Sequence, residues 1–264
     1  MMRRFYALVL LLFATHSIYA IDFIVDGLKY RTFVNDNDVY VKGLENPNYS
    51  GELSIPETVS YKDKEYAVKT IDNDAFMGCE GLTAVSIGNS VESIYSWAFK
   101  DCTNLASFTI PASVEYIGEE VFVNTAWYNA LPDGLIYKDD VLFGFKGSKA
   151  GFEGHLDIAD GTRIIAGGAL KYAMSITSVK IPNTVTFICQ SAFFESGITS
   201  LTIPSSVKKI YTEAFNWCNH LEQIEVESGN PIYDSRNNCN AIIETGKNQL
   251  AFGCKNTIIP NSVT

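Results

Sequence analysis

The clearest copy of a recurring motif is LASFTIPASVEYIGEEVF at residues 105–122. Residues 176–193 read ITSVKIPNTVTFICQSAF, and residues 198–215 read ITSLTIPSSVKKIYTEAF. Residues 82–99 follow the same frame without the proline. Self-similarity at a period of about 20–50 residues is typical of a solenoid, in which each unit rests on its neighbours.

The copies stay in phase along the chain. Phe76, Phe99 and Phe122 lie 23 residues apart, and Phe193 and Phe215 lie 22 apart. In each copy the last two apolar residues before the proline are two positions apart, so they point to one face of a strand. The proline lacks an N–H and ends that strand. We expect stacked coils, with the strands side by side in one parallel sheet.

The frame I-P-x-S-V-x-x-I-x-x-x-A-F-x-x-C resembles the BspA-like leucine-rich repeat over roughly residues 50–264. Two further segments are similar to family hallmarks, Trp127-Tyr128 with residues 132–137, and residues 233–244. The resemblance implies a right-handed leucine-rich-repeat solenoid with a parallel β-sheet face, short helical turns or loops on the other wall, and inserted β-hairpins. It also implies an extracellular or cell-surface protein used in adhesion or ligand capture, without enzymatic activity.

The N-terminus predicts export. Residues 1–20 pass from Arg3 and Arg4 through an apolar run to Ala20, which is the order of a signal peptide. The run is too short to span a bilayer, and no second run of about 20 apolar residues follows it. We therefore expect a secreted or cell-surface protein with no transmembrane segment after cleavage. An uncleaved anchor and a buried N-terminal helix are the alternatives.

Residues 21–50 are predicted to form an N-terminal β cap, with a hairpin turn at Asp26-Gly27. Residues 51–264 are predicted to form the solenoid of about seven to eight coils, the last of them incomplete. Longer intervals between the repeats place inserts near residues 60–70, 125–153 and 227–256.

The composition argues against nucleic acid and anionic membranes as partners. The chain has 20 basic and 30 acidic residues, a formal net charge of −10. Without Arg3 and Arg4 the balance becomes more acidic still. Phosphate backbones are bound by clustered Lys and Arg, and the sequence contains no such cluster.

Residue types that carry catalysis are scarce. Beyond the predicted signal peptide the only histidines are His155 and His220, and no metal, nucleotide or hydrolase motif accompanies them. His155 and Asp157 lie on one face of a predicted strand, as an exposed binding pair or a solvated one, without an evident nucleophile. We predict no catalytic residues, no metal and no cofactor.

The outward positions of the predicted strands are rich in hydroxyls, which both donate and accept hydrogen bonds. Seven steps of about 4.8 Å would give one face of about 34 Å. We expect this face to bind an extracellular protein or, alternatively, a glycan. An exposed aromatic platform at Trp127, Tyr128 or Trp217 would favour the glycan. The outward residues are Ala84, Ser86, Ser107, Thr109, His155, Asp157, Ser178, Lys180, Ser200, Thr202, Gln223 and Glu225.

The six cysteines fall into two groups of interest. Cys79, Cys102 and Cys218 each follow a repeat Phe by three residues, as buried apolar fillers or, for the first two, a disulfide. A hairpin turning at Gly246-Lys247 would pair Ile243 with Leu250 and Ala241 with Phe252, and it would set Cys239 opposite Cys254. Export permits a Cys239–Cys254 disulfide. Two separate thiols are the alternative.

Cleavage near Ala20 can be tested on secreted material. Its N-terminal sequence should begin close to Ile21, because the basic, apolar and small-residue order directs the signal peptidase there. An intact Met1 on a product retained in the cytosol would contradict the prediction.

Overall fold

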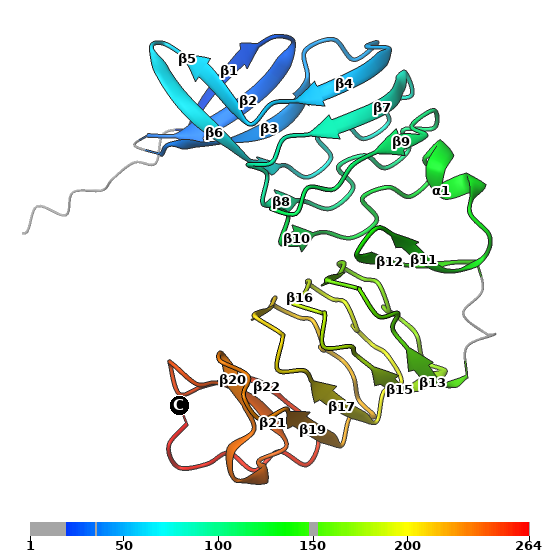
Figure 1. The fold of residues 1–264 in the computed structure, drawn as a ribbon, viewed down its shortest axis with the longest axis vertical. Helices are drawn as coiled ribbons and strands as arrows, with labels where there is room; N and C mark the ends of the chain where they lie inside the picture. Colours follow the sequence, from blue (N-terminus) through cyan, green and yellow to red (C-terminus); the bar gives the residue numbers. More distant parts are fainter. Residues whose placement is uncertain (1–19, 35, 148–152, 264) are drawn as a thin grey trace, which may run out of the picture.

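The computed structural model describes residues 20–34, 36–147 and 153–263. The chain is a β-solenoid of about seven turns, and successive coils stack along the long axis of Figure 1. Apart from Ala20, the predicted signal peptide lies outside the described residues. Within the described ranges, no helix is both long and apolar enough to cross a membrane.

The first wall of the solenoid carries the strands that the repeat predicts. They form two parallel sheets, and their apolar residues face inward, as Leu82, Val85 and Ile87 do in β7. Register is kept from coil to coil, with Val85 opposite Phe108 and Leu201 opposite Ile224. One sheet comprises β4 (Gly51–Ile55), β7 (Leu82–Ile87) and β9 (Ser107–Phe108); the other comprises β13 (Gly154–Asp157), β15 (Ile176–Lys180), β17 (Ser200–Ile203) and β19 (Gln223–Val226).

The second wall consists of two-residue parallel strands, where short helical turns or loops were expected. Ile94 lies opposite Ile117, and Ile165 lies opposite Ile188. β-Branched isoleucine suits a pleated, half-buried surface, which explains a strand at this point. These strands are β8 (Ser93–Ile94), β10 (Tyr116–Ile117), β14 (Ile164–Ile165), β16 (Phe187–Ile188) and β18 (Lys209–Ile210).

The third wall contains the Ala-Phe pair of the repeats, which is replaced by Val121-Phe122 and Ala169-Leu170 in two coils. The backbone N–H of Phe76 donates to the carbonyl of Ala98 at 2.8 Å, and that of Phe99 donates to Val121 at 3.0 Å. The turns are made with residues of positive φ, such as Trp97 at 62°. Alternate N–H groups in these coils thus bond to carbonyls of the next coil, a pattern that we call the third-wall ladder.

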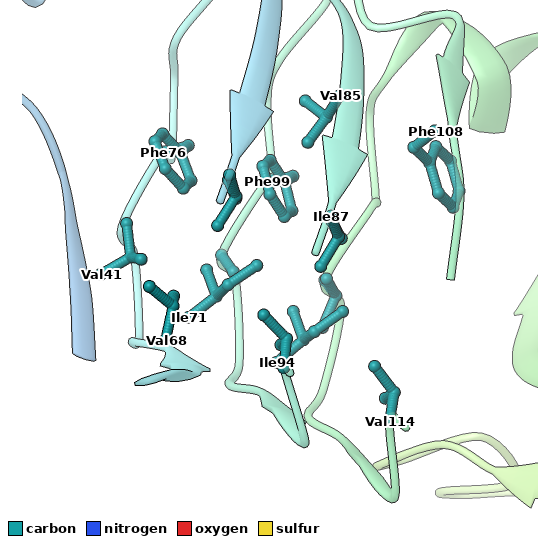
Figure 2. Close-up of a cluster of buried hydrophobic side chains, with 14 of the residues drawn as sticks. Val41, Val68, Ile71, Phe76, Val85, Ile87, Ile94, Phe99, Phe108 and Val114 are labelled. Atoms are coloured by element: carbon teal, nitrogen blue, oxygen red, sulfur yellow. The ribbon is translucent and has the colours of Figure 1, made fainter. Parts of the chain in front are cut away.

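The core between the walls is a file of stacked rings flanked by aliphatic side chains. Phe76 and Phe99 are stacked at 5.0 Å between ring centroids, and Phe99 and Phe122 at 5.3 Å. All three side chains are buried. Figure 2 shows Phe76 and Phe99 beside Ile71 and Ile94, which come from the second wall. Fully buried Ala98 leaves room for the backbone of the adjacent coil.

The N-terminal strands extend the second wall. β2 pairs antiparallel with β1, to which a turn at Asp26-Gly27 connects it, and also antiparallel with β3. β3 in turn pairs in parallel with β6. β5 and β6 form an antiparallel hairpin in the interval between the first two coils. The strands are β1 (Ala20–Val25), β2 (Leu28–Phe33), β3 (Asp38–Leu44), β5 (Thr58–Tyr61) and β6 (Lys64–Ile71).

The middle insert separates the two sheets of the first wall. It contains helix α1 (Ala126–Ala130) and the hairpin of β11 (Gly134–Lys138) and β12 (Val141–Lys146). β12 pairs in parallel with β14, so it takes the place of a coil on the second wall. Residues 148–152 of the predicted insert lie outside the described residues.

The solenoid bends at this insert (Figure 1). On the side of β10 and β16 the two halves meet, where the rings of Tyr116 and Tyr211 lie 4.7 Å apart. The backbones also meet there, because the N–H of Gly167 donates to Ile117 at 2.8 Å. A Cβ atom at Gly167 would lie 2.8 Å from the carbonyl carbon of Gly118. Only glycine permits that approach.

The C-terminal insert forms β20 (Tyr233–Asp234), a 3-10 turn at Arg236–Asn238, β21 (Ala241–Glu244) and β22 (Gln249–Gly253). Ile243 lies opposite Leu250, as predicted. The predicted pairing of Ala241 with Phe252 is wrong. A bulge between Ile242 and Ile243 shifts the register by one residue, so that Ala241 lies opposite Gly253.

Replacing Phe99 by alanine should lower the free energy of unfolding by about 3–5 kcal/mol, because the ring is buried between two stacked rings and leaves a cavity. Chemical denaturation measures the change. Met77→Ala is the matched control, since Met77 follows the equivalent Phe76 but is 46% exposed. Equal effects of the two substitutions would contradict the stacked core.

Candidate binding surface

The predicted outward residues are exposed or half-buried on the first wall. In the C-terminal sheet they form two rows that run from strand to strand. His155 lies opposite Ser178, which lies opposite Ser200, which lies opposite Gln223. In the second row Asp157 lies opposite Lys180, and Thr202 opposite Glu225. We call these two rows the C-terminal face.

The N-terminal sheet presents a shorter set. Ser54 lies opposite Ser86, and Ala84 lies opposite Ser107, while Thr109 follows the end of β9. The prediction of one continuous face is wrong, because β9 and β13 belong to different sheets separated by α1 and the β11–β12 hairpin. Four strands spaced by about 4.8 Å give the C-terminal face a width of about 14 Å.

The cross-strand register supplies His155 with a hydroxyl partner that the sequence did not reveal. Nδ1 of His155 lies 2.7 Å from Oγ of Ser178, and Nε2 lies 3.4 Å from Oδ1 of Asp157. The side chains of His155 and Asp157 are 55% and 66% exposed. Charges in open water interact weakly, so this trio lacks the desolvated surroundings in which an acid–base relay is effective. Its three polar groups suit hydrogen bonding to a partner.

The three aromatic residues considered for a glycan platform differ in their surroundings. Trp127 packs edge-on against Phe108 at 5.0 Å and Phe143 at 5.7 Å, so it closes the core beside the insert. The Tyr128 ring lies below the ammonium group of Lys146. Trp217, at a positive φ of 61°, is 65% exposed. Of the three, Trp217 presents the most open ring.

The recurring cysteines are free thiols, and Cys102 and Cys218 share one role. Sγ of Cys102 donates to the carbonyl of Phe76, and Sγ of Cys218 donates to that of Phe193, each at 3.0 Å. The thiol thus bonds to the repeat phenylalanine of the preceding coil. The alternative Cys79–Cys102 disulfide is not formed.

The predicted Cys239–Cys254 disulfide is not formed either, since both residues are free thiols. The bulge in the hairpin is the physical reason. It shifts the pairing by one residue, and Sγ of Cys254 lies 3.3 Å from the carbonyl oxygen of Asn240. Cys239 packs with Ala241 and Ile243, whereas Cys254 packs against the cluster that contains Ile242.

The comparisons with known proteins give one family. Residues 55–133 and 152–263 match the family described as "BspA type Leucine rich repeat region", with 6 copies. No curated protein matches the chain.

Several solved structures are similar to the chain. A leucine-rich cell surface protein from Faecalibacterium prausnitzii A2-165 is 23% identical, with a TM-score of 0.42 over 88% of this chain and 61% of that protein. The pneumococcal vaccine antigen PcpA is 16% identical, with a TM-score of 0.38 over 92% and 60%. A leucine-rich repeat protein from Bacteroides ovatus ATCC 8483 is 20% identical, with a TM-score of 0.39 over 79% and 66%. The chain thus spans about three fifths of the first two proteins.

Buried thiols should resist alkylation in the folded protein. Desolvation by burial raises the pKa of Cys102 and of Cys189 to about 12. Both thiols therefore stay protonated at pH 8.5, and their ionisation destabilises the fold only as the pH rises from the unfolded pKa towards 12. We expect iodoacetamide to modify half-buried Cys79 and Cys254 first, as read by mass spectrometry. In guanidinium chloride all six should react. Equal alkylation rates of all six thiols in the folded protein would contradict the closed core.

Proposed function

We propose that this chain, which belongs to the BspA-type leucine-rich repeat family, is a secreted or cell-surface protein that binds another protein through the C-terminal face. The family is one of repeat scaffolds with a binding or surface role and generally without enzymatic activity. Adhesion to an extracellular protein is the specific role that we infer. The order of residues 1–20 supports export.

The in-register rows of the C-terminal face carry this proposal. Hydroxyls of Ser178, Ser200 and Thr202 alternate with charged Lys180 and Glu225, all on one side of a four-stranded sheet. The apolar residues between them are buried, so the sheet fixes the spacing of the polar groups without support from a ligand. Such a rigid polar surface loses little conformational entropy on binding.

A glycan ligand is the second candidate, and the exposed ring of Trp217 favours it. Aromatic rings offer an apolar body with a polar edge, and tryptophan is enriched at binding sites for that reason. This ring lies on the third wall rather than on the C-terminal face, so the two candidates depend on different residues.

The two candidates can be separated with a panel of extracellular-matrix proteins and a glycan array. For a protein that binds the chain, Thr202→Arg should weaken binding at least tenfold, about 1.4 kcal/mol, because it places a long cation in the middle of the C-terminal face. Surface plasmon resonance gives the dissociation constant.

Thr212→Arg is the matched control, since Thr212 is exposed outside the first-wall strands. Binding that tolerates Thr202→Arg, or that Thr212→Arg weakens equally, would contradict the proposed surface. Loss of glycan-array binding in the Trp217→Ala variant, with unchanged glycan-array binding in the Thr202→Arg variant, would favour the glycan.

A further inference from the structure

The third-wall ladder joins successive coils within each half of the solenoid. In the N-terminal half, Trp97 donates to Glu119 and Phe99 to Val121, both at 3.0 Å. In the C-terminal half, Leu170 donates to Ala192 at 2.7 Å. Alternate N–H groups of these coils therefore bond to carbonyls of the following coil, as in a parallel sheet. Among the described residues, the N–H of Ser191 is an exception to this pattern.

The ladder is interrupted where the halves meet. Glu120 and Phe122 occupy the positions that Trp97 and Phe99 hold one coil earlier, yet their N–H groups find no acceptor among the described residues. On the opposite side the carbonyls of Gly167 and Ala169 accept no hydrogen bond within the same described ranges. The insert explains the gap, because α1 and the β11–β12 hairpin enter the chain between these two coils.

A cavity of about 300 Å³ lies between these two rows of backbone groups. Glu120 and Phe122 line one side, and Gly167 and Ala169 line the other. We call this cavity the junction cleft. The rings that line it belong to Phe122, Trp127, Tyr128, Phe143, Phe145 and Tyr172.

The charged groups of the junction cleft are paired. Nζ of Lys171 lies 2.9 Å from Glu119, and Nζ of Lys100 lies 2.6 Å from Glu120. The lysine charges offset those of the two carboxylates, so the cleft has no strong preference for an ion. Its distinguishing features are the aromatic lining and the unsatisfied backbone groups.

We propose that the junction cleft binds an extended peptide segment of a partner protein, which completes the third-wall ladder. The two free donors are two residues apart, and carbonyls on one edge of an extended chain recur at the same interval. A peptide strand can therefore accept from Glu120 and Phe122 together, as a partner strand does in β-augmentation. Its apolar side chains would contact the rings of Trp127 and Tyr172.

A glycan matches these features less well, because its hydroxyls do not repeat at the two-residue interval of a strand. The cleft is also distinct from the C-terminal face, which lies on the first wall. Failure of either proposal therefore leaves the other standing.

Amide hydrogen exchange tests the unsatisfied donors directly. In the free protein, the amides of Glu120 and Phe122 should exchange at least tenfold faster than those of Trp97 and Phe99, their counterparts in the preceding coil. Comparable protection of all four amides would overturn the interrupted ladder.

A displayed library of random heptapeptides tests for the occupant. Peptides enriched on the full chain should slow the exchange of the Glu120 and Phe122 amides. Val123→Phe should reduce their affinity at least tenfold, because Val123 lines the cleft. The fold should accept this ring, since Phe194 holds the equivalent position two coils later.

Met77→Phe is the matched control, because Met77 holds the equivalent position in a coil whose ladder is intact, and it should leave binding unchanged. Thr202→Arg should also have no effect, which separates this site from the C-terminal face. The proposal is overturned if no peptide is enriched, or if the enriched peptides protect other amides. It is also overturned if Val123→Phe weakens binding to a glycan array but not to the peptides.

Discussion

Each coil of this solenoid bonds through its backbone to the coils on either side, and this mutual hydrogen bonding constrains the rest of the structure. The spacing between successive coils must be the same in all three walls, as in the pairing of Ile94 with Ile117 and the bond from Phe99 to Val121. The side chains of the core must also stack at this spacing. Flat rings stacked at 5.0 and 5.3 Å come close to the strand spacing of about 4.8 Å. Phenylalanine at this position therefore suits both the core and the ladder.

Inserted residues are accommodated only where they form a separate sheet, extend a wall, or take the place of a coil in a wall. The β5–β6 hairpin and the β20–β22 strands join sheets of their own or extend the second wall. The middle insert differs, because β12 replaces a coil on the second wall alone. The first and third walls are left without a matching strand, which produces both the divided sheet and the junction cleft.

The sequence could predict the repeat because its apolar positions are set by neighbours at a fixed interval. The inward direction of Val85 and the outward direction of Ser86 follow from strand alternation alone. The pairing of Ile243 with Leu250 followed from the turn at Gly246-Lys247. Local pattern was sufficient in each of these cases.

The remaining features depend on contacts between distant segments. A single-residue bulge between Ile242 and Ile243 has no marker in the sequence, and it shifts the register on which the Cys239–Cys254 disulfide was predicted. The division of the first wall depends on where the β11–β12 hairpin docks, which spacing does not specify. The hydrogen bond between His155 and Ser178 spans 23 residues and needed the register of two coils.

The close approach at Gly118 and Gly167 has a consequence for the curvature of the molecule. Because a Cβ at Gly167 would lie 2.8 Å from one backbone atom of Gly118 and 2.9 Å from that of Glu119, any other residue would push the halves apart on this side. The angle between the halves would then change, and every residue beyond the contact would move with it. The absence of one methyl group thus governs the direction in which roughly a hundred residues point.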